Sequence, residues 1–157
     1  MTEEEGEPMA PHEGQGLSRF APYLMNRIAH RYNQNLHASV TGIGLTVPKM
    51  RVLAALAAMG ELTINDLSVV AISEQSTMSR TLDQMEREGL IERKVSEKDS
   101  RVRLVDLTPA GLSAYRTVWP EMSAAEEALF TGLSDTQRED FLDTLSQILL
   151  NIRQNEL

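Results

Sequence analysis

The first regular pattern along the chain is an apolar residue at every fourth position between Leu17 and Val40. This spacing brings the apolar side chains to one face of an α-helix. We expect this helix to end near Val40, before Gly42 and Gly44. The residues that define its apolar face are Phe20, Leu24, Ile28, Tyr32 and Leu36.

Capping residues predict where three further helices begin and end. Thr46 predicts the start of a second helix, which Gly60 closes. Thr63, followed by an Asp three residues later, predicts a short third helix whose start is similar to a capping box. Ser73 is expected to cap a fourth helix, and Gly89 supplies the left-handed residue that ends it.

Beyond the fourth helix, the sequence predicts two strands and two more helices. Residues 91–95 and 101–107 are predicted to form two strands joined by a polar turn, and the second shows an imperfect alternation of apolar and polar residues. Thr108 begins a fifth helix, in which Pro120 predicts a kink or a break. Ser134 begins a last helix with a capping box. This helix carries a wide apolar stripe of Phe141, Leu142, Leu145, Ile148, Leu149 and Ile152.

These elements predict a mostly α-helical fold with a small β-wing: a winged helix-turn-helix between N- and C-terminal helices. We expect residues 1–16, which hold five Glu and little to bury, to form a disordered acidic tail. We divide the remainder into an N-terminal dimerisation helix (17–44), the winged helix-turn-helix (45–108) and C-terminal dimerisation helices (109–157). The wide stripe of the last helix suits a dimer platform, and an intrachain core would produce the same periodicity.

Charge is distributed unevenly along the chain. The formal net charge of −8 argues against a nucleic-acid partner, because nucleic-acid-binding domains are usually basic. The acidic residues concentrate near the two ends, whereas residues 17–107 carry twelve Lys or Arg and ten Asp or Glu. This distribution weakens the objection to DNA binding without removing it.

Several classes of protein do not fit the sequence. The absence of Cys excludes disulfides and thiolate metal sites, and it fits a reducing compartment. The acidic start is unlike a secretory signal, and no apolar run approaches the roughly 20 residues that span a bilayer. We find no phosphate-binding glycine loop, nucleophile elbow or cluster of metal ligands. We therefore expect a cytoplasmic protein that is not an enzyme, needs no cofactor and does not contact membranes.

The predicted fourth helix divides into an apolar face and a polar face. Met78, Leu82 and Met85 recur at spacings of four and three, which is typical of a face seated on a core. The first turns present short polar side chains and Arg80, which can match the donors and acceptors of base edges in the major groove. A solvated surface helix would show the same division, so this helix alone does not decide the function.

The polar turn between the predicted strands, residues 96–101, bears Lys98 and Arg101 on a protruding hairpin. A protruding Arg can enter a narrow minor groove, where the negative potential is concentrated. Asp99 could hold that guanidinium in an extended pose by a charge-assisted hydrogen bond. The alternative is a solvated hairpin tip with a surface ion pair of little energetic value.

Five motifs, in order and spacing, resemble the MarR family of bacterial transcription regulators over roughly residues 17–153. They are Leu45-Thr46, the segment from Ser76 to Arg80, the segment from Glu88 to Arg93, Asp99-Ser100-Arg101, and the segment from Leu107 to Gly111. The resemblance implies a sequence-specific transcription regulator, a ligand-responsive repressor that binds a palindromic operator in double-stranded DNA as a homodimer. It assigns the DNA contacts to Gln75, Ser76, Thr77, Ser79, Arg80, Lys98, Asp99 and Arg101.

The resemblance also implies a small-molecule effector, a phenolic or lipophilic acid, bound between the dimer helices and the winged helix. The residues expected to line that pocket are Tyr23, Arg27, His30, His37, Met50 and Trp119. The chain departs from the family pattern at two places. Ser96-Glu97 replaces a common Asp-Pro at the wing tip, and Lys49-Met50 stands where an aromatic residue is frequent. A winged helix used only for protein–protein contact is the alternative function.

Overall fold

The computed structural model describes residues 16–153, and the predicted acidic tail lies outside this range except for its last residue. A 3-10 turn, η1 (Leu17–Arg19), leads into the first long helix, α1 (Ala21–Gly42). This helix begins later than the apolar spacing predicted, because Phe20 is extended and Pro22 occupies the first turn. It ends at Gly42 rather than near Val40.

The centre of the chain forms a winged-helix unit, residues 47–107. It contains the helices α2 (Val47–Met59), α3 (Ile64–Val70) and α4 (Gln75–Arg87). Its antiparallel sheet has the strand order β1-β3-β2, with β1 (Leu62–Thr63), β2 (Ile91–Val95) and β3 (Arg103–Leu107). The predicted two-stranded wing therefore gains a third strand, because Leu62 pairs with Val105. The predicted fold class is confirmed.

Side-chain caps begin four of the helices at the predicted residues. The hydroxyl oxygens of Thr46, Thr63, Thr108 and Ser134 each accept a hydrogen bond from the backbone N–H three residues later. The prediction for Ser73 is wrong. Its backbone N–H donates to the Ser68 carbonyl oxygen (2.9 Å) and its hydroxyl to the Glu74 carbonyl oxygen (3.3 Å), so it belongs to the end of α3. Glu74 is the N-cap of α4, without a side-chain hydrogen bond.

One apolar core holds the winged-helix unit together. Leu53 from α2, Leu82 from α4 and Val105 from β3 are each completely buried, so α2, α4 and the sheet share one interior. Burial of a Leu side chain contributes about 1.5–3 kcal/mol. The core consists of Val52, Leu53, Ala55, Leu56, Leu62, Leu67, Ala71, Met78, Leu82, Met85, Ile91 and Val105.

A second, smaller core joins α1 and α2 to the fifth helix, α5 (Pro109–Leu129). It is formed by Leu36, Val40, Met50 and Val118. The predicted break at Pro120 does not occur, because α5 continues through it to Leu129 while the neighbouring Val118 is fully buried. Within residues 16–153 we find no single helix long and apolar enough to cross a membrane, and α1 and α2 satisfy that test only as a pair bent by 92°.

The start of α5 is fastened to the turn that follows α4. The Thr108 hydroxyl donates to the Gly89 carbonyl oxygen (2.6 Å), and the Thr108 N–H donates to the Leu90 carbonyl oxygen (3.1 Å). A Cβ at Gly111 would lie 1.9 Å from that Leu90 oxygen, so only glycine fits this close approach. Gly89 itself has φ 73°, the left-handed conformation predicted for the end of α4.

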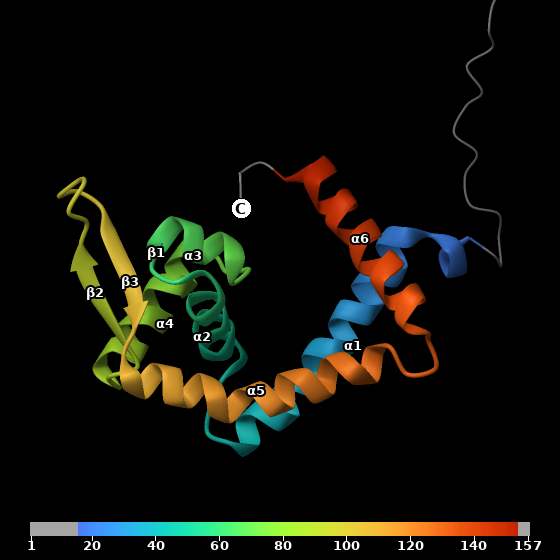
Figure 1. Cartoon of the computed structure of the whole chain (residues 1–157), viewed down its shortest axis with the longest axis horizontal. Helices are drawn as coiled ribbons and strands as arrows, with labels where there is room; N and C mark the ends of the chain where they lie inside the picture. Colours follow the sequence, from blue (N-terminus) through green and yellow to red (C-terminus); the bar gives the residue numbers. More distant parts are fainter. Residues whose placement is uncertain (1–15, 154–157) are drawn as a thin grey trace, which may run out of the picture.

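Three helical segments extend away from the winged-helix unit and form what we call the outer arm, residues 17–35, 119–129 and 135–152. Figure 1 shows α5 running from the wing to the side of the molecule where α6 (Asp135–Ile152) lies. No residue of the outer arm is buried. Large apolar side chains are exposed along it, among them Phe20, Ile28, Leu129, Phe141, Leu149 and Ile152. The intrachain core that was the alternative for the last helix is therefore not present.

Candidate nucleic-acid interface

The first turns of α4 present a polar surface on an apolar base. Met78, Leu82 and Met85 are buried in the core of the winged-helix unit, as their spacing predicted. The polar residues assigned to DNA on this helix are all exposed: Gln75, Ser76, Thr77, Ser79 and Arg80. Because the apolar side holds the helix in place, the polar side chains project from a fixed backbone.

A hydrogen bond between side chains links α4 to the start of α3. The Gln75 amide nitrogen donates to the Asn65 side-chain oxygen at 2.7 Å, and both residues are exposed. Asn65 was not predicted from the sequence, because it lies ten positions from Gln75 and on a different helix. This hydrogen bond occupies one N–H of the Gln75 side-chain amide, which was predicted to contact DNA.

Arg101 stands at the tip of the β2–β3 turn with 89% of its side chain exposed. Asp99 holds it by two side-chain contacts, Nε–Oδ1 at 3.1 Å and Nη2–Oδ2 at 3.0 Å. The Arg101 backbone N–H also donates to Oδ1 (3.0 Å). These hydrogen bonds from the Arg101 side chain and backbone lower the pKa of Asp99 from its ordinary value, and the same side-chain bond raises the pKa of Arg101. The predicted partnership of Asp99 and Arg101 is present.

Carboxylates on the second half of α4 and at its C-cap, Glu88, pair with cations from β2 and α2. Arg93 on β2 contacts Asp83 (Nη2–Oδ1 2.8 Å) and Glu86 (Nη1–Oε2 3.5 Å). The Lys49 ammonium on α2 contacts both oxygens of Glu88, at 2.7 and 2.8 Å. The hydrogen bond from Lys49 is the main cause that lowers the pKa of Glu88. These pairs offset negative charge on the helix that would otherwise repel phosphate.

Some other Lys and Arg side chains on α4 and the wing do not pair with carboxylates of the described chain. Arg80, Lys98 and Arg103 are exposed, and within residues 16–153 they form no ion pair. Arg103 was not singled out from the sequence, because its place on β3 at the base of the turn becomes evident only in the sheet register. Arg101 and Arg103 line a hollow of about 300 Å³ together with Asn65, so the wing and the start of α3 border one concave surface.

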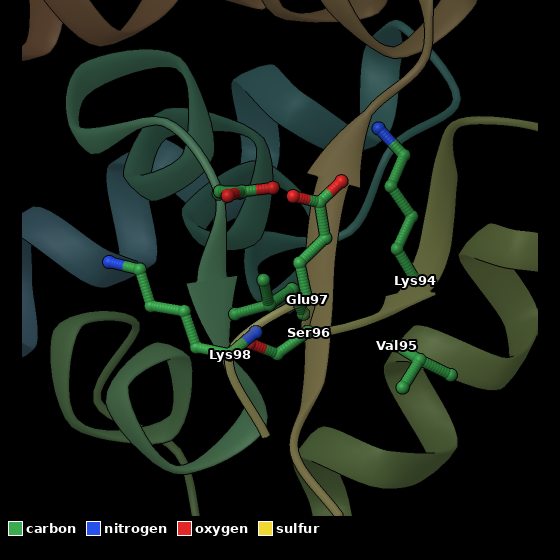
Figure 2. Close-up of a pocket in the computed structure, with 7 residues that line it drawn as sticks. Lys94, Val95, Ser96, Glu97 and Lys98 are labelled. Atoms are coloured by element: carbon green, nitrogen blue, oxygen red, sulfur yellow. The ribbon is translucent and has the colours of Figure 1, made fainter. Parts of the chain in front are cut away.

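A second hollow, of about 540 Å³, lies on the other side of the wing and carries both signs of charge. Figure 2 shows Glu97 between Lys94 and Lys98, with the two ammonium groups on opposite sides of its carboxylate. Glu61 and Leu104 complete the lining. Mixed charge of this kind is suited neither to a phenolic acid nor to a run of phosphates.

The residues predicted for an effector do not come together in one cavity. Met50 is buried in the second core, and Trp119 lies against Tyr115 with ring centroids 5.9 Å apart. His30 and His37 border a shallow surface on α1. Arg27 donates to the Tyr23 hydroxyl (3.1 Å). Within residues 16–153, the hollows described for this subunit do not unite these residues, and their role in binding an effector stays a prediction.

A different hollow, of about 380 Å³, lies between α1 and α5. Tyr32 and Ile28 contribute from α1, and Ala125 and Leu129 from α5, with Arg27 at the edge. Burial raises the pKa of Tyr32 above its ordinary value of 10.0, so its hydroxyl stays protonated at neutral pH. Of the six residues assigned to an effector, only Arg27 borders this hollow.

Comparison with known proteins gives consistent matches over most of the chain. A model of the MarR family matches residues 43–102. The HTH-type transcriptional repressor IacR of Pseudomonas putida is 30% identical over 133 residues, which cover 85% of this chain and 80% of the relative. A crystal structure of a MarR family transcriptional regulator from Silicibacter pomeroyi superposes with a TM-score of 0.84 at 45% identity, covering 91% of this chain and 97% of that one. The S. aureus MepR–DNA complex matches with a TM-score of 0.72 at 25% identity, covering 85% and 98%.

Proposed function

The chain belongs to the MarR family of transcriptional regulators, and from this premise we propose that it is a homodimeric repressor that binds a palindromic operator in double-stranded DNA. Each subunit would insert the first turns of α4 into a major groove and Arg101 into the neighbouring minor groove. The relatives are named as regulators, which supports a regulatory rather than an enzymatic role. Because its target is chromosomal DNA, we assign the protein to the cytoplasm.

One observation carries this proposal: an exposed polar helix face and an exposed arginine project from the same rigid unit. The α4 side chains from Gln75 to Arg80 are exposed except for Met78. Arg101 is held extended by Asp99 rather than folded onto the protein surface. A helix that fits the major groove and an Arg that fits a narrow minor groove form two complementary contacts with one stretch of duplex.

The distribution of ion pairs supports DNA binding despite the net charge of −8. Acidic side chains on α4 pair with Arg93 and Lys49. Exposed cations nearby, such as Arg80 and Arg103, have no such partner within the described residues and can pair with phosphate or guanine. The local surface is thus more favourable to an anion than the charge of the whole chain suggests.

Dimerisation through the outer arm follows from its composition. Many of its large apolar side chains are exposed in the subunit, and a large exposed apolar patch usually marks an interface. A twofold dimer would present two winged-helix units to two half-sites. For helix-turn-helix dimers these half-sites are about one turn of DNA, roughly 34 Å, apart.

An effector site is a further part of the proposal. The hollow between α1 and α5 has apolar walls and an Arg at its edge, which suits the ring and the acid group of a lipophilic or phenolic acid. It borders the outer arm, so a bound acid would act on the helices that set the separation of the two winged-helix units. Displacement of bound DNA by such acids in a titration would test this part.

The proposal can be tested with the purified full-length protein and a fluorescent duplex from the promoter region of its own gene. Binding should weaken steeply as salt rises, because each phosphate contact releases counterions. Arg101→Ala should weaken binding to every duplex, whereas Arg80→Ala should cost about 1–3 kcal/mol and relax the preference for particular base pairs. Equal affinity of the wild type and both variants for matched and scrambled duplexes would refute the proposal.

A further inference from the structure

The hydrogen bond between Gln75 and Asn65 bears on which base the protein selects. Resting on the proposed function, we propose that Asn65 is a positioning residue that holds the Gln75 amide in the orientation that reads adenine. The two residues then act as one unit that favours an A·T pair at one position of each half-site. Asn65 was not assigned to DNA from the sequence, and its role follows from the geometry.

Both ends of this contact are fixed by the backbone. Gln75 is the first residue of α4, which Met78 and Leu82 anchor in the core. Asn65 is the second residue of α3, whose start is capped by Thr63 (Asp66 N to Oγ1, 3.1 Å). The 2.7 Å bond from the Gln75 amide nitrogen to the Asn65 oxygen therefore joins two rigid elements rather than two mobile loops.

The remaining hydrogen-bonding groups of Gln75 match adenine. A side-chain amide nitrogen has two N–H groups, and Asn65 takes one of them. The proposal assigns to Asn65 the N–H that lies trans to the Gln75 amide oxygen, which leaves the second N–H and the oxygen side by side. Adenine presents an acceptor at N7 and a donor at its N6 amino group, which is the complementary pair. Guanine presents acceptors at both N7 and O6, so the Gln75 oxygen would face an oxygen.

Asn65 gives selectivity because it prevents the amide from turning over. A free Gln side chain can rotate its amide by half a turn and offer N–H groups where the oxygen was. Here that rotation would bring the Gln75 oxygen against the Asn65 oxygen and lose the 2.7 Å bond. A phosphate held by the Asn65 nitrogen would keep the Asn65 amide from rotating as well, so the pair would present a single donor–acceptor order to the groove in the bound complex.

The amide nitrogen of Asn65 is suited to a contact with the DNA backbone. Within the described chain its amide nitrogen donates to no protein group, and the residue borders the 300 Å³ hollow that Arg101 and Arg103 also line. The cation of Arg103 and an amide donor on one concave surface suit a DNA phosphate beside the minor groove that Arg101 would enter. Asn65 thus has two separable parts: an oxygen that orients Gln75, and a nitrogen that can hold phosphate.

The test begins with the full-length protein and a randomised duplex library. The selected sites should contain adenine at one fixed position in each half-site, and Gln75→Ala should erase the preference at that position alone. Replacing this adenine with 7-deazaadenine, which lacks the N7 acceptor, should weaken wild-type binding by roughly 5- to 150-fold. The same replacement should leave the affinity of Gln75→Ala unchanged.

Two variants of Asn65 then separate its roles. Asn65→Ala should reduce the adenine preference, and the double variant with Gln75→Ala should show no more loss of preference than Gln75→Ala does. Asn65→Asp keeps an oxygen that accepts from Gln75, so the preference should persist while affinity for all duplexes falls. The melting temperature of each variant is recorded as a control for folding.

The outcomes distinguish this inference from the function on which it rests. Wild-type protein that selects a site with guanine at the Gln75 position, or Asn65→Ala protein that keeps the full adenine preference, would overturn the role of Asn65 and leave the regulator intact. Wild-type protein that selects no site and binds DNA without salt dependence would overturn the proposed function itself.

Discussion

The winged-helix unit and the outer arm use apolar residues in opposite ways. The winged-helix unit buries twelve of them in one core, so it can be stable within one chain. The outer arm is built from longer helices and has no buried residue. Its apolar side chains are covered only when another surface meets them. The comparison indicates that one subunit is sufficient to form the DNA-binding surface. The relative position of two winged-helix units, in contrast, depends on dimerisation.

The largest expected effect comes from removing a core side chain of the winged-helix unit. Leu82→Ala should lower the free energy of unfolding by about 2–5 kcal/mol, because the completely buried side chain leaves a cavity under α4. Denaturant unfolding followed by circular dichroism would measure this loss. If the winged-helix unit is stable by itself, the loss should not depend on protein concentration. If the loss in free energy of unfolding disappears at high protein concentration, the winged-helix unit depends on dimerisation as the outer arm does, and the comparison is wrong.

The next effect concerns the ion pair that ties α4 to α2. Lys49→Met should destabilise the fold by about 1.5–3 kcal/mol at neutral pH, because the Glu88 carboxylate loses a charged hydrogen-bond partner. Glu88 is 39% exposed and keeps a hydrogen bond from Gln84 at 3.0 Å, which favours the lower end of that range. The measurement is chemical unfolding of the variant beside the wild type.

The same pair has a defined dependence on pH. Lys49 lowers the pKa of Glu88 below its ordinary value of 4.5, so the stabilisation is complete above that pH and is lost as the pH falls through the lower pKa of the folded state. The difference in stability between wild type and Lys49→Met should therefore narrow in acid. A difference that stays constant from neutral pH into acid would contradict the role of this ion pair.

A charge introduced into the outer arm should affect assembly more than folding. Leu149 is 57% exposed in the subunit, so Leu149→Glu should change the stability of the separated subunit by no more than about 0.5 kcal/mol. It should raise the dimer Kd by about tenfold or more, equivalent to about 1.4 kcal/mol, since a carboxylate would enter an apolar interface. Sedimentation at several concentrations measures the Kd.

Ser146→Glu provides the matched control on the same helix, because it adds the same charge at an exposed polar position. It should leave the dimer Kd close to that of the wild type. Equal effects of Ser146→Glu and Leu149→Glu would mean that charge alone, and not the apolar surface of the outer arm, governs association.

The smallest expected effect is at the wing tip. Asp99→Ala should weaken DNA binding by less than Arg101→Ala does, because Asp99 only orients an exposed Arg101 that can still reach the groove. Folding stability should not change. Anisotropy titrations of Asp99→Ala and Arg101→Ala on one duplex would compare them. A larger loss for Asp99→Ala than for Arg101→Ala would refute this order of roles.

Local rules predicted most of the fold from sequence. Thr46, Thr63, Thr108 and Ser134 cap helices because a hydroxyl three residues before a free N–H is sufficient, and this requires no knowledge of tertiary structure. The prediction for Ser73 failed because its backbone N–H donates to the Ser68 carbonyl oxygen at the end of α3. Of the kink or break predicted at Pro120, the break is wrong, because α5 continues through Pro120 and Val118 and Met122 on either side of it pack in the second core.

The candidate site was predictable where it follows helical periodicity and not where it depends on contacts between elements. Exposure of Gln75 to Arg80 follows from the burial of Met78 and Leu82. The bond from Gln75 to Asn65 depends on the crossing of α3 and α4, which sequence spacing does not encode. The expected effector residues were drawn from a resemblance rather than from a contact, and the structure separates them. Their role in binding an effector stays a prediction.

Because α5 is attached to the turn after α4, a rotation of α5 at its far end moves the winged-helix unit with it. Thr108 and Gly111 fasten one end to the winged-helix unit, while the other end lies in the outer arm. The 21 residues of α5 span roughly 30 Å, so a tilt of α5 by about 10° at the far end would displace the winged-helix unit by about 5 Å. That exceeds the rise of one base pair, about 3.4 Å. Small rotations between subunits would therefore be enough to take a dimer out of register with a duplex of fixed pitch.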